Sequence, residues 1–374
     1  MKIVHIISGL SVGGAEMMLL KLVSSMDNKK FTPVVISLMD GGEVRKKIEQ
    51  AGIPVYSLGM RKRISSLLFL FKIRKLMRHL KPDVIQGWMY HGNLVSSLAR
   101  GMCQGSPKVF WNIRHSLHNL DDEKQLTRIL IKISVLFAAK VTNIIYNSKI
   151  SESQHVSIGY PVKKSVVIPN GFDLSLFKPT ASAKLKLRKE LDLPKETLLV
   201  GMIGRYHPLK DHNNFLRAAG IAFKKNMNLY FLLAGRNIDL NNAKLHNDIV
   251  NNKLLGRVFL LGERDDIPMI TAALDVAVLS SNSEAFPNVV GEAMACEVPC
   301  VVTDVGDAAW MVRDTGKVVP ARNAEELAAA ILEIISYDEI KRKKLGNSAR
   351  RRIKEYFSLP NVCEQYESIY SNIT

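Results

Sequence analysis

The sequence lacks the features that mark several large classes of protein. It has only four cysteines in 374 residues, no Asp-x-Asp motif, and no apolar run approaching the roughly 18 residues of a transmembrane helix. The one close cysteine pair, Cys296 and Cys300, has no histidine nearby, so we interpret it as two buried thiols rather than a metal site. These absences predict a reduced, cytoplasmic protein that does not span a membrane.

Acidic residues are also scarce relative to basic ones, and the formal net charge is +17. Such an excess favours anionic partners, namely nucleic acid, anionic lipid or phosphorylated substrates. Residues 61–81 hold eight Lys or Arg and no acid around the apolar run Leu67–Phe71, and a second basic cluster covers 341–344 and 350–354. We find no aromatic-basic motif or helix-turn-helix pattern that would indicate nucleic-acid binding.

Short apolar runs alternate with amphipathic stretches almost throughout the chain, including 16–26, 43–50 and 125–139. Because these runs are apolar on successive residues, they predict strands buried on both faces, as in parallel sheets. The N-terminal run MKIVHIIS is expected to be the first strand rather than a signal peptide, because no small-residue cleavage site follows it. The pattern restarts after PNGFDLSLFKPTASAKLK, the expected linker, which predicts an α/β protein of two doubly wound, Rossmann-like domains.

Two loops follow predicted strands and carry chemistry suited to an anionic ligand. Gly13 and Gly14, in SGLSVGGAE, would let backbone N–H groups approach an anion before a helix. In GMIGRYHPLKDH, the loop after Gly204 presents Arg205 and Lys210, a basic pair that suits a diphosphate. Doubly wound sheets bind ligands at the carboxyl ends of their strands, so we expect the ligand in a cleft between the two domains.

A third loop combines two carboxylates with a helix start. In SSNSEAFPNVVGEAM, Glu284 lies in the loop and Glu292 one turn inside a helix that begins at Pro287 or Asn288. The positive end of the helix suits phosphate, and each carboxylate can accept hydrogen bonds from a pair of vicinal hydroxyls. Taken alone, capping and dipole roles for the two glutamates would explain the pattern equally well.

Together these motifs resemble the family-4 glycosyltransferases, retaining enzymes of the GT-B fold. The resemblance covers essentially the whole chain: SVGGAE, VIPNGFDLSLFKP, the R-x₄-K element GRYHPLKDH, the E-x₇-E element EAFPNVVGE, and the closing FSLPNVCEQYESIY. It implies an acceptor-binding domain over 1–170, a nucleotide-sugar-binding domain over 171–357 that faces it across a cleft, and a helix over 358–374 that packs back on the first domain.

The resemblance also implies roles for individual residues. Arg205 and Lys210 would hold the donor diphosphate, Glu292 the ribose hydroxyls and Glu284 the donor sugar. A histidine of the first domain would lie near the reacting sugar, and both His115 and His91 are candidates. The remaining donor contacts would come from Gly13, Gly14, Gly204, Phe286, Pro287, Asn288 and Val289, with Arg264 bordering the base.

The implied reaction is transfer of a hexose or HexNAc from a nucleoside-diphosphate sugar, with UDP expected, to a glycan or lipid-linked saccharide. The resemblance points to bacterial lipopolysaccharide, capsule or exopolysaccharide synthesis. Two cations in place of Asp-x-Asp predict that no metal is needed, and the basic stretch 61–81 predicts binding to the inner face of the cytoplasmic membrane. The alternatives are a nucleotide-sugar epimerase of the same architecture and a non-catalytic protein that binds an anionic ligand.

Overall fold

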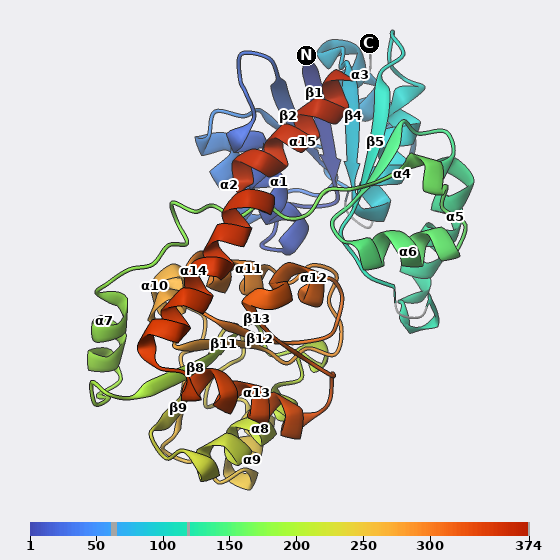
Figure 1. The fold of residues 1–374 in the computed structure, drawn as a ribbon. Helices are drawn as coiled ribbons and strands as arrows, with labels where there is room; N and C mark the ends of the chain where they lie inside the picture. The colour runs from blue at the N-terminus through green and yellow to red at the C-terminus, as the bar shows by residue number, and fades with distance from the viewer. Residues whose placement is uncertain (61–65, 118–119, 373–374) are drawn as a thin grey trace. The chain divides into compact units, whose positions relative to one another are not determined.

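The computed structural model describes residues 1–60, 66–117 and 120–372, and the chain forms two compact units. Unit 1 consists of Met1–Gly171 and Leu359–Thr374, and unit 2 consists of Phe172–Ser358. Each unit contains a parallel sheet covered by helices on both faces (Figure 1). The predicted fold class, two doubly wound α/β domains, is confirmed.

The sheet of unit 1 has the strand order β3-β2-β1-β4-β5-β6-β7, and every neighbouring pair is parallel. The order reverses between β1 and β4, which is the switch point typical of a doubly wound sheet. All seven apolar runs of the first half of the sequence form strands. They are β1 (Lys2–Ile7), β2 (Thr32–Ser37), β3 (Val55–Ser57), β4 (Val84–Trp88), β5 (Lys108–Ile113), β6 (Asn143–Tyr146) and β7 (Ser165–Val167).

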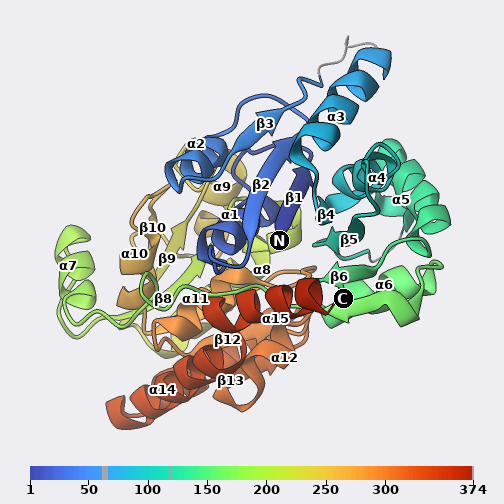
Figure 2. The same ribbon diagram turned by 90° about the horizontal axis from the view of Figure 1, so that it is seen from above.

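Two helical layers cover this sheet, because successive strand side chains point to opposite faces. Ile3 and Ile7 pack with helices α1, α2 and α15, whereas Val4 and Ile6 belong to the core that α3 and α4 cover. Next to α4, α5 covers the same face over β5 and β6 (Figure 2). The bounds are α1 (Gly14–Ser25), α2 (Glu43–Gln50), α3 (Ser66–Leu80), α4 (Met89–Arg100), α5 (Gln125–Ala138), α6 (Lys149–Ser157) and α15 (Leu359–Ser371).

The sheet of unit 2 has the order β10-β9-β8-β11-β12-β13, again parallel throughout. Its strands are β8 (Leu198–Ile203), β9 (Leu229–Ala234), β10 (Val258–Leu260), β11 (Val276–Leu279), β12 (Cys300–Thr303) and β13 (Gly316–Val319). One face packs against α8 (His212–Lys225), α9 (Ala243–Asn251) and α13 (Ala324–Ser336). The other packs against α7 (Ala183–Glu190), α10 (Ile267–Ala273), α11 (Asn288–Ala295), α12 (Ala308–Val312) and α14 (Glu339–Tyr356).

The segment expected to be a linker is mostly part of unit 2. Phe172 and Phe177 are buried in its core, and the last residues of the segment begin α7. The closing helix α15 returns to unit 1, where Val362, Tyr366 and Tyr370 are fully buried beside α1 (Figure 1). The return of the C-terminal helix to the first domain is therefore as predicted.

Candidate active site

The loop after β8 places the predicted basic pair at the carboxyl end of the sheet of unit 2. The loop leaves the strand at Gly204, passes Arg205, and ends in a short 3₁₀ helix, Pro208–Lys210. Gly235, after the neighbouring strand β9, has φ +145°, and a Cβ there would lie 2.3 Å from the Gly204 carbonyl oxygen. Only glycine permits this approach, so the two loops pack backbone against backbone.

This loop is joined to the loop that follows β11, the other neighbour of β8. The Ser280 hydroxyl donates to the backbone carbonyls of Lys210, at 2.9 Å, and Asp211, at 3.0 Å. The Asn282 N–H donates to the Leu209 carbonyl at 2.8 Å. The R-x₄-K element and the start of the E-x₇-E element therefore form one connected surface.

On this surface Lys210 and Glu284 form an ion pair. Lys210 Nζ lies 2.6 Å from Glu284 Oε1, and the Ser281 hydroxyl donates to the same oxygen at 2.7 Å. The two charged side chains keep 23% and 14% of their surface exposed, so the pair is partly buried but open to solvent. The sequence predicted both residues for the donor site without predicting that they pair.

The Glu284 loop is also fixed from its other side. Gly306 has φ +56°, and a Cβ there would lie 2.4 Å from the Glu284 carbonyl oxygen. The Asp307 N–H donates to the Ala285 carbonyl at 3.0 Å, and the Thr303 hydroxyl donates to the Ser281 carbonyl at 2.7 Å. Loops after β11 and β12 thus hold the carboxylate of Glu284 in place before any ligand binds.

The residues that follow Glu284 divide between the core and the surface. The Phe286 ring is buried among Phe172, Trp310 and Phe357, so only its backbone is available to a ligand. Helix α11 then begins at Asn288, with Pro287 as its N-cap and no side-chain capping bond. Asn288, Val289 and Glu292 are partly exposed on this helix, as a donor-binding role requires.

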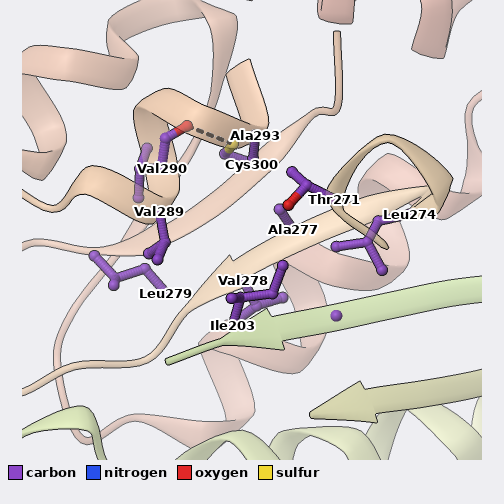
Figure 3. Close-up of a pocket in the computed structure, with 11 residues that line it drawn as sticks. Ile203, Thr271, Leu274, Ala277, Val278, Leu279, Val289, Val290, Ala293 and Cys300 are labelled. Atoms are coloured by element: carbon purple, nitrogen blue, oxygen red, sulfur yellow. Dashed lines mark hydrogen bonds between the residues drawn. The ribbon is translucent and has the colours of Figure 1, made fainter. Parts of the chain in front are cut away.

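A small apolar cavity of about 10 Å³ lies beneath α11, between β8, β11 and α10 (Figure 3). Its lining includes Ile203, Leu274, Val290 and Cys300, whose thiol approaches the Val290 carbonyl at 3.8 Å. Burial raises the pKa of the Cys300 thiol to about 12, in agreement with the predicted inert, buried cysteine pair. The cavity is far too small for a sugar nucleotide and belongs to the core that supports α11.

The positive charge of this surface contributes to the lowered pKa values of two histidines near Lys210. Burial, together with a smaller effect of the Lys210 charge, lowers the pKa of His212 to about 4. Burial also lowers the pKa of His207, and Arg205 and Lys210 both add to that shift. The positive potential that disfavours a further proton favours a bound diphosphate.

Arg264, the candidate for the nucleotide base, is engaged elsewhere in this structure. Its guanidinium lies 2.6 Å from a Glu190 carboxylate oxygen and makes two 2.8 Å hydrogen bonds to Asp266. Its bonds to Asp266 and then to Glu190 raise its pKa. A contact to the base would require these ion pairs to share the guanidinium or to open.

In unit 1, the predicted residues gather at the carboxyl ends of three neighbouring strands. Gly13 and Gly14 begin α1 after β1, His91 lies in the first turn of α4 after β4, and His115 follows β5. A Cβ on Gly14 would meet nothing within 4 Å, so the surface at this helix start is open. The sheet order therefore places both candidate histidines at the same edge as the glycine loop.

Of the two candidate histidines, His115 is held by a set of contacts with neighbouring residues. Its Nε2 lies 2.6 Å from Glu123 Oε1, its ring meets the edge of Tyr90, and its carbonyl accepts from the Ser151 hydroxyl. Neither Glu123 nor Ser281, the residue that supports Glu284, was predicted from the sequence. The S-x-x-E spacing of Ser281 and Glu284 could have indicated a contact within one turn, but nothing in the sequence marks Glu123.

Comparison with known proteins decides the family. Residues 183–352 match the family described as Glycosyl transferases group 1, and residues 12–176 match Glycosyltransferase Family 4. The chain is a family-4 glycosyltransferase. The alternatives of an epimerase and of a non-catalytic binding protein are thereby set aside.

Relatives of this glycosyltransferase match along most of its length. It is 25% identical to the UDP-Gal:alpha-D-GlcNAc-diphosphoundecaprenol alpha-1,3-galactosyltransferase of Escherichia coli, over 82% of this chain and 80% of the relative. It is 25% identical to the lipopolysaccharide core biosynthesis glycosyltransferase LpsE of Rhizobium meliloti (strain 1021), over 98% of each chain. Among solved structures, the chain is similar to Anabaena HepE, and the match covers 100% of both chains. The TM-score is 0.88 for HepE in complex with UDP, at 24% identity, and 0.84 for HepE in complex with UDP and glucose, at 25% identity.

Proposed function

We propose that this glycosyltransferase transfers a sugar from a UDP-sugar to a saccharide acceptor, with retention of the anomeric configuration and without a metal ion. The observation that carries the proposal is the Lys210–Glu284 pair, which stands on joined loops beside Arg205 and α11. The names of the relatives support the nucleotide, since HepE was solved with UDP and the Escherichia coli relative is named for UDP-Gal.

Different residues of unit 2 bind different parts of the donor. Arg205 and Lys210 hold the diphosphate, together with the backbone of Gly204 and the start of α11 at Pro287–Val289. Glu292 accepts hydrogen bonds from the ribose. Glu284, whose Oε1 is occupied by Lys210 and Ser281, offers Oε2 to a hydroxyl of the donor sugar. Arg264 is the remaining candidate for the base.

The reaction then follows from where charge develops. The bond between the anomeric carbon and the diphosphate oxygen breaks, and the acceptor oxygen bonds to the anomeric carbon on the same face. The acceptor proton passes to the departing phosphate oxygen. Arg205 and Lys210 stabilise the negative charge on that leaving group. A metal ion has this role in enzymes that carry an Asp-x-Asp motif. Gly13 and Gly14 border the diphosphate, and His115 or His91 contacts the reacting sugar.

A donor screen tests this proposal directly. UDP-, GDP- and ADP-sugars are compared for their protection of the full-length protein against thermal unfolding, since a ligand at 100 times its Kd adds about 2.7 kcal/mol. We expect UDP-sugars to protect, and we expect turnover only when an acceptor is present. Turnover of a UDP-sugar to its epimer without acceptor would overturn the proposal, as would protection by none of the three classes.

The same proposal places the acceptor on a membrane, because one helical layer of unit 1 has an unusual surface. Helices α3, α4 and α5 cover one face of the sheet and contain no acidic residue. They carry seven cations, which are Lys72, Arg74, Lys75, Arg78, Arg100, Arg128 and Lys132. Their exposed apolar side chains are Leu68, Phe71, Leu98, Leu126, Ile129, Ile133, Leu136 and Phe137.

Helix α5 contributes most of this apolar surface. Its exposed Leu, Ile and Phe side chains recur at positions 126, 129, 133, 136 and 137, which is one stripe of a helix. The side that faces the sheet is made of smaller residues as well, namely Ser134 and Ala138 beside Ile131. Leu136 is 73% exposed, so the larger apolar side of the helix points away from the core.

The stretch 61–81, which was predicted to bind the membrane, supplies part of the same layer. Phe71 is 65% exposed and Leu68 is also exposed, whereas Ile73 and Met77 are buried against the sheet. Arg61, Lys62 and Arg63 lie outside the described residues. In the described part of the chain no helix is both long and apolar enough to cross a bilayer.

An exposed apolar stripe flanked by cations, on helices that contain no acid, suits the interface of an anionic membrane. The acid beside it, Asp121, precedes α5 and is paired with Arg128 at 2.7 Å. We propose that α5, with α3 and α4, binds that surface reversibly and so brings the protein to a lipid-linked acceptor at the inner face of the cytoplasmic membrane. Co-sedimentation with phosphatidylglycerol vesicles is expected at low salt and should weaken as salt rises. Absence of binding to such vesicles would indicate a soluble acceptor.

A further inference from the structure

A second basic surface lies in unit 2 and has no part in the proposed reaction. A groove of about 630 Å³ runs between β13, the 3₁₀ helix Arg313–Thr315 and helix α14. Its lining includes Asp314, Lys317, Lys341, Lys344, Arg351, Arg352 and Glu355, together with the aromatic residues Tyr337 and Tyr356. A volume of this size lies in the range of pockets that hold small molecules.

The groove and the donor loops lie at opposite edges of the same sheet. The strands of unit 2 are all parallel, and Lys210 and Glu284 follow the carboxyl ends of β8 and β11. The groove instead includes residues 314–317, at the amino end of the edge strand β13. A ligand in the groove would therefore bind apart from the diphosphate site.

The cations of α14 that line the groove lie along one side of the helix. Lys341, Lys344, Ser348 and Arg352 are spaced by three, four and four residues, and Arg351 flanks them. Lys344 and Arg351 are exposed, and neither has a carboxylate partner in the described part of the chain. Five cations and two carboxylates line the groove, which leaves an excess of positive charge.

Hydrogen bonds to the backbone hold part of the wall of the groove in place. Arg352 is partly buried, and it donates from Nε to the Met311 carbonyl at 2.8 Å and from Nη2 to the Trp310 carbonyl at 2.7 Å. No protein group among the described residues accepts from its Nη1, which remains available to a ligand. Burial lowers the pKa of Arg352 and the charge of Arg313 adds to that shift, whereas Tyr356, Asp314 and Glu355 act in the opposite direction.

Outside the lining, the carboxylate of Glu333 pairs with only one of these cations, Lys317. Glu333 of α13 lies 2.5 Å from Lys317 Nζ and accepts from the Tyr337 hydroxyl at 2.6 Å. Lys341 Nζ stands 3.6 Å above the centroid of the Tyr337 ring. Tyr356, at the other end of the groove, stays exposed and offers a ring surface.

We propose that this groove is a binding site for a phosphate ester. The phosphate would lie among Lys344, Arg351 and Nη1 of Arg352, and the organic part of the ester would pack against the Tyr356 ring. Phosphate fits this geometry because its several oxygens can accept from three cations at once, with Arg offering paired donors. The ester could be a free metabolite or a lipid headgroup, since the recognised chemistry is the same.

Isothermal titration with inorganic pyrophosphate tests the site, in the presence of saturating UDP so that the donor loops are already occupied. The test variant is Lys344→Ala/Arg351→Ala, which removes two exposed side chains and should fold normally. The matched control is Lys186→Ala/Lys343→Ala, which also removes two exposed cations but lies outside the groove lining. We expect one saturable site in the wild type and the control, with affinity at least about tenfold weaker in the test variant.

A second arm replaces pyrophosphate with phosphatidylglycerol vesicles, using protein that carries Leu136→Gln so that the α5 surface contributes less. Loss of binding by the groove variant in the first arm alone identifies a free phosphate ester, and loss in the second arm, with or without loss in the first, identifies a lipid headgroup. Equal binding by all three proteins in both arms, or no binding by the wild type in either, would overturn the proposal. Neither readout depends on glycosyl transfer.

Discussion

The two units share an architecture but differ in where they expose apolar side chains. In unit 1, eight of the large exposed apolar residues lie on α3, α4 and α5. In unit 2, they are scattered over separate elements, as with Leu240 in a loop, Val250 on α9 and Val318 on β13. Scattered exposure is normal for a soluble surface, whereas a gathered patch marks an interaction site.

The helical layers of the two units also differ in their charged residues. The helices of unit 2 mix both signs, with Glu325, Glu326 and Glu333 on α13 and Glu339 and Glu355 on the basic helix α14. Helices α3, α4 and α5 of unit 1 have no acid at all. This difference agrees with the proposal that unit 1 binds a membrane surface and that unit 2 binds the charged donor.

The largest expected effect lies in unit 2. Lys210→Ala should lower kcat about 10²–10³-fold, because it removes a preorganised cation that is proposed to face the leaving diphosphate and leaves Glu284 without its cationic partner. Glu284→Gln should lower kcat less, since an amide can still accept from Lys210. Steady-state kinetics with a UDP-sugar and a soluble acceptor analogue measure both, with Lys186→Ala as the control. Wild-type turnover by a folded Lys210→Ala protein would contradict the assignment.

The second effect sharpens the contrast between the exposed surfaces. Leu136→Gln should weaken binding to phosphatidylglycerol vesicles about tenfold, because about 1.5–3 kcal/mol accompanies full burial of a leucine and the stripe is only partly immersed. The matched control is Leu240→Gln in unit 2, where the side chain is 78% exposed on a loop. Co-sedimentation with equal loss in both variants would remove the distinction between the units.

The third effect concerns acid stability and again separates the units. Burial lowers the pKa of His5 to about 3 and that of His155 to about 4 in unit 1, whereas unit 2 has His212 with a pKa of about 4. Between these values and the ordinary pKa of about 6.5, the unfolded chain binds more protons, so stability is present above pH 6.5 and falls as pH decreases. Each histidine should cost on the order of 2 kcal/mol at pH 5.

Hydrogen exchange resolved by segment is the suitable measurement, because two units need not unfold together. Unit 1 should lose more protection than unit 2 between pH 7 and pH 5. The variant His5→Asn retains an acceptor for the Trp88 indole, which donates to His5 Nδ1 at 3.2 Å, and should reduce that loss. Equal loss in the wild type and in this variant would exclude His5 as a cause.

The smallest expected effect is that of a chelator. Because Arg205 and Lys210 are proposed to supply the positive charge at the diphosphate, we expect EDTA to change the rate of transfer less than about twofold. A rate assay before and after dialysis against EDTA measures this. Complete loss that Mg²⁺ or Mn²⁺ restores would reject the two-cation mechanism.

The sequence was sufficient for the strands and for the loops at their ends. Runs such as those of β1 and β8 are short and largely apolar on successive residues, which is a local property typical of buried parallel strands. The roles of Arg205, Lys210 and Glu284 remain predictions, although the structure joins their loops. The ion pair itself could not be predicted, because it depends on β8 and β11 being neighbours in the sheet.

The exposed apolar stripe of α5 was missed for a related reason. Its apolar spacing is that of any amphipathic helix, and such a pattern ordinarily marks the buried side. Only the packing against β5 and β6 decides that Ile131, Ser134 and Ala138 face inward and the larger stripe faces outward. Similarly, Phe286 belongs to a site motif in the sequence, and only the fold shows its ring in the core.

The path of the chain between the units has a consequence for synthesis on the ribosome. The chain leaves unit 1 at Gly171 and returns at Leu359, and these two residues pack closely together, while Phe172 pairs with Phe357 just inside unit 2. Unit 2 is therefore one continuous segment, whereas unit 1 awaits α15, which supplies Tyr366 and Tyr370 to its core. The unit that emerges first from the ribosome can therefore complete its core only after the whole of the second unit has been synthesised.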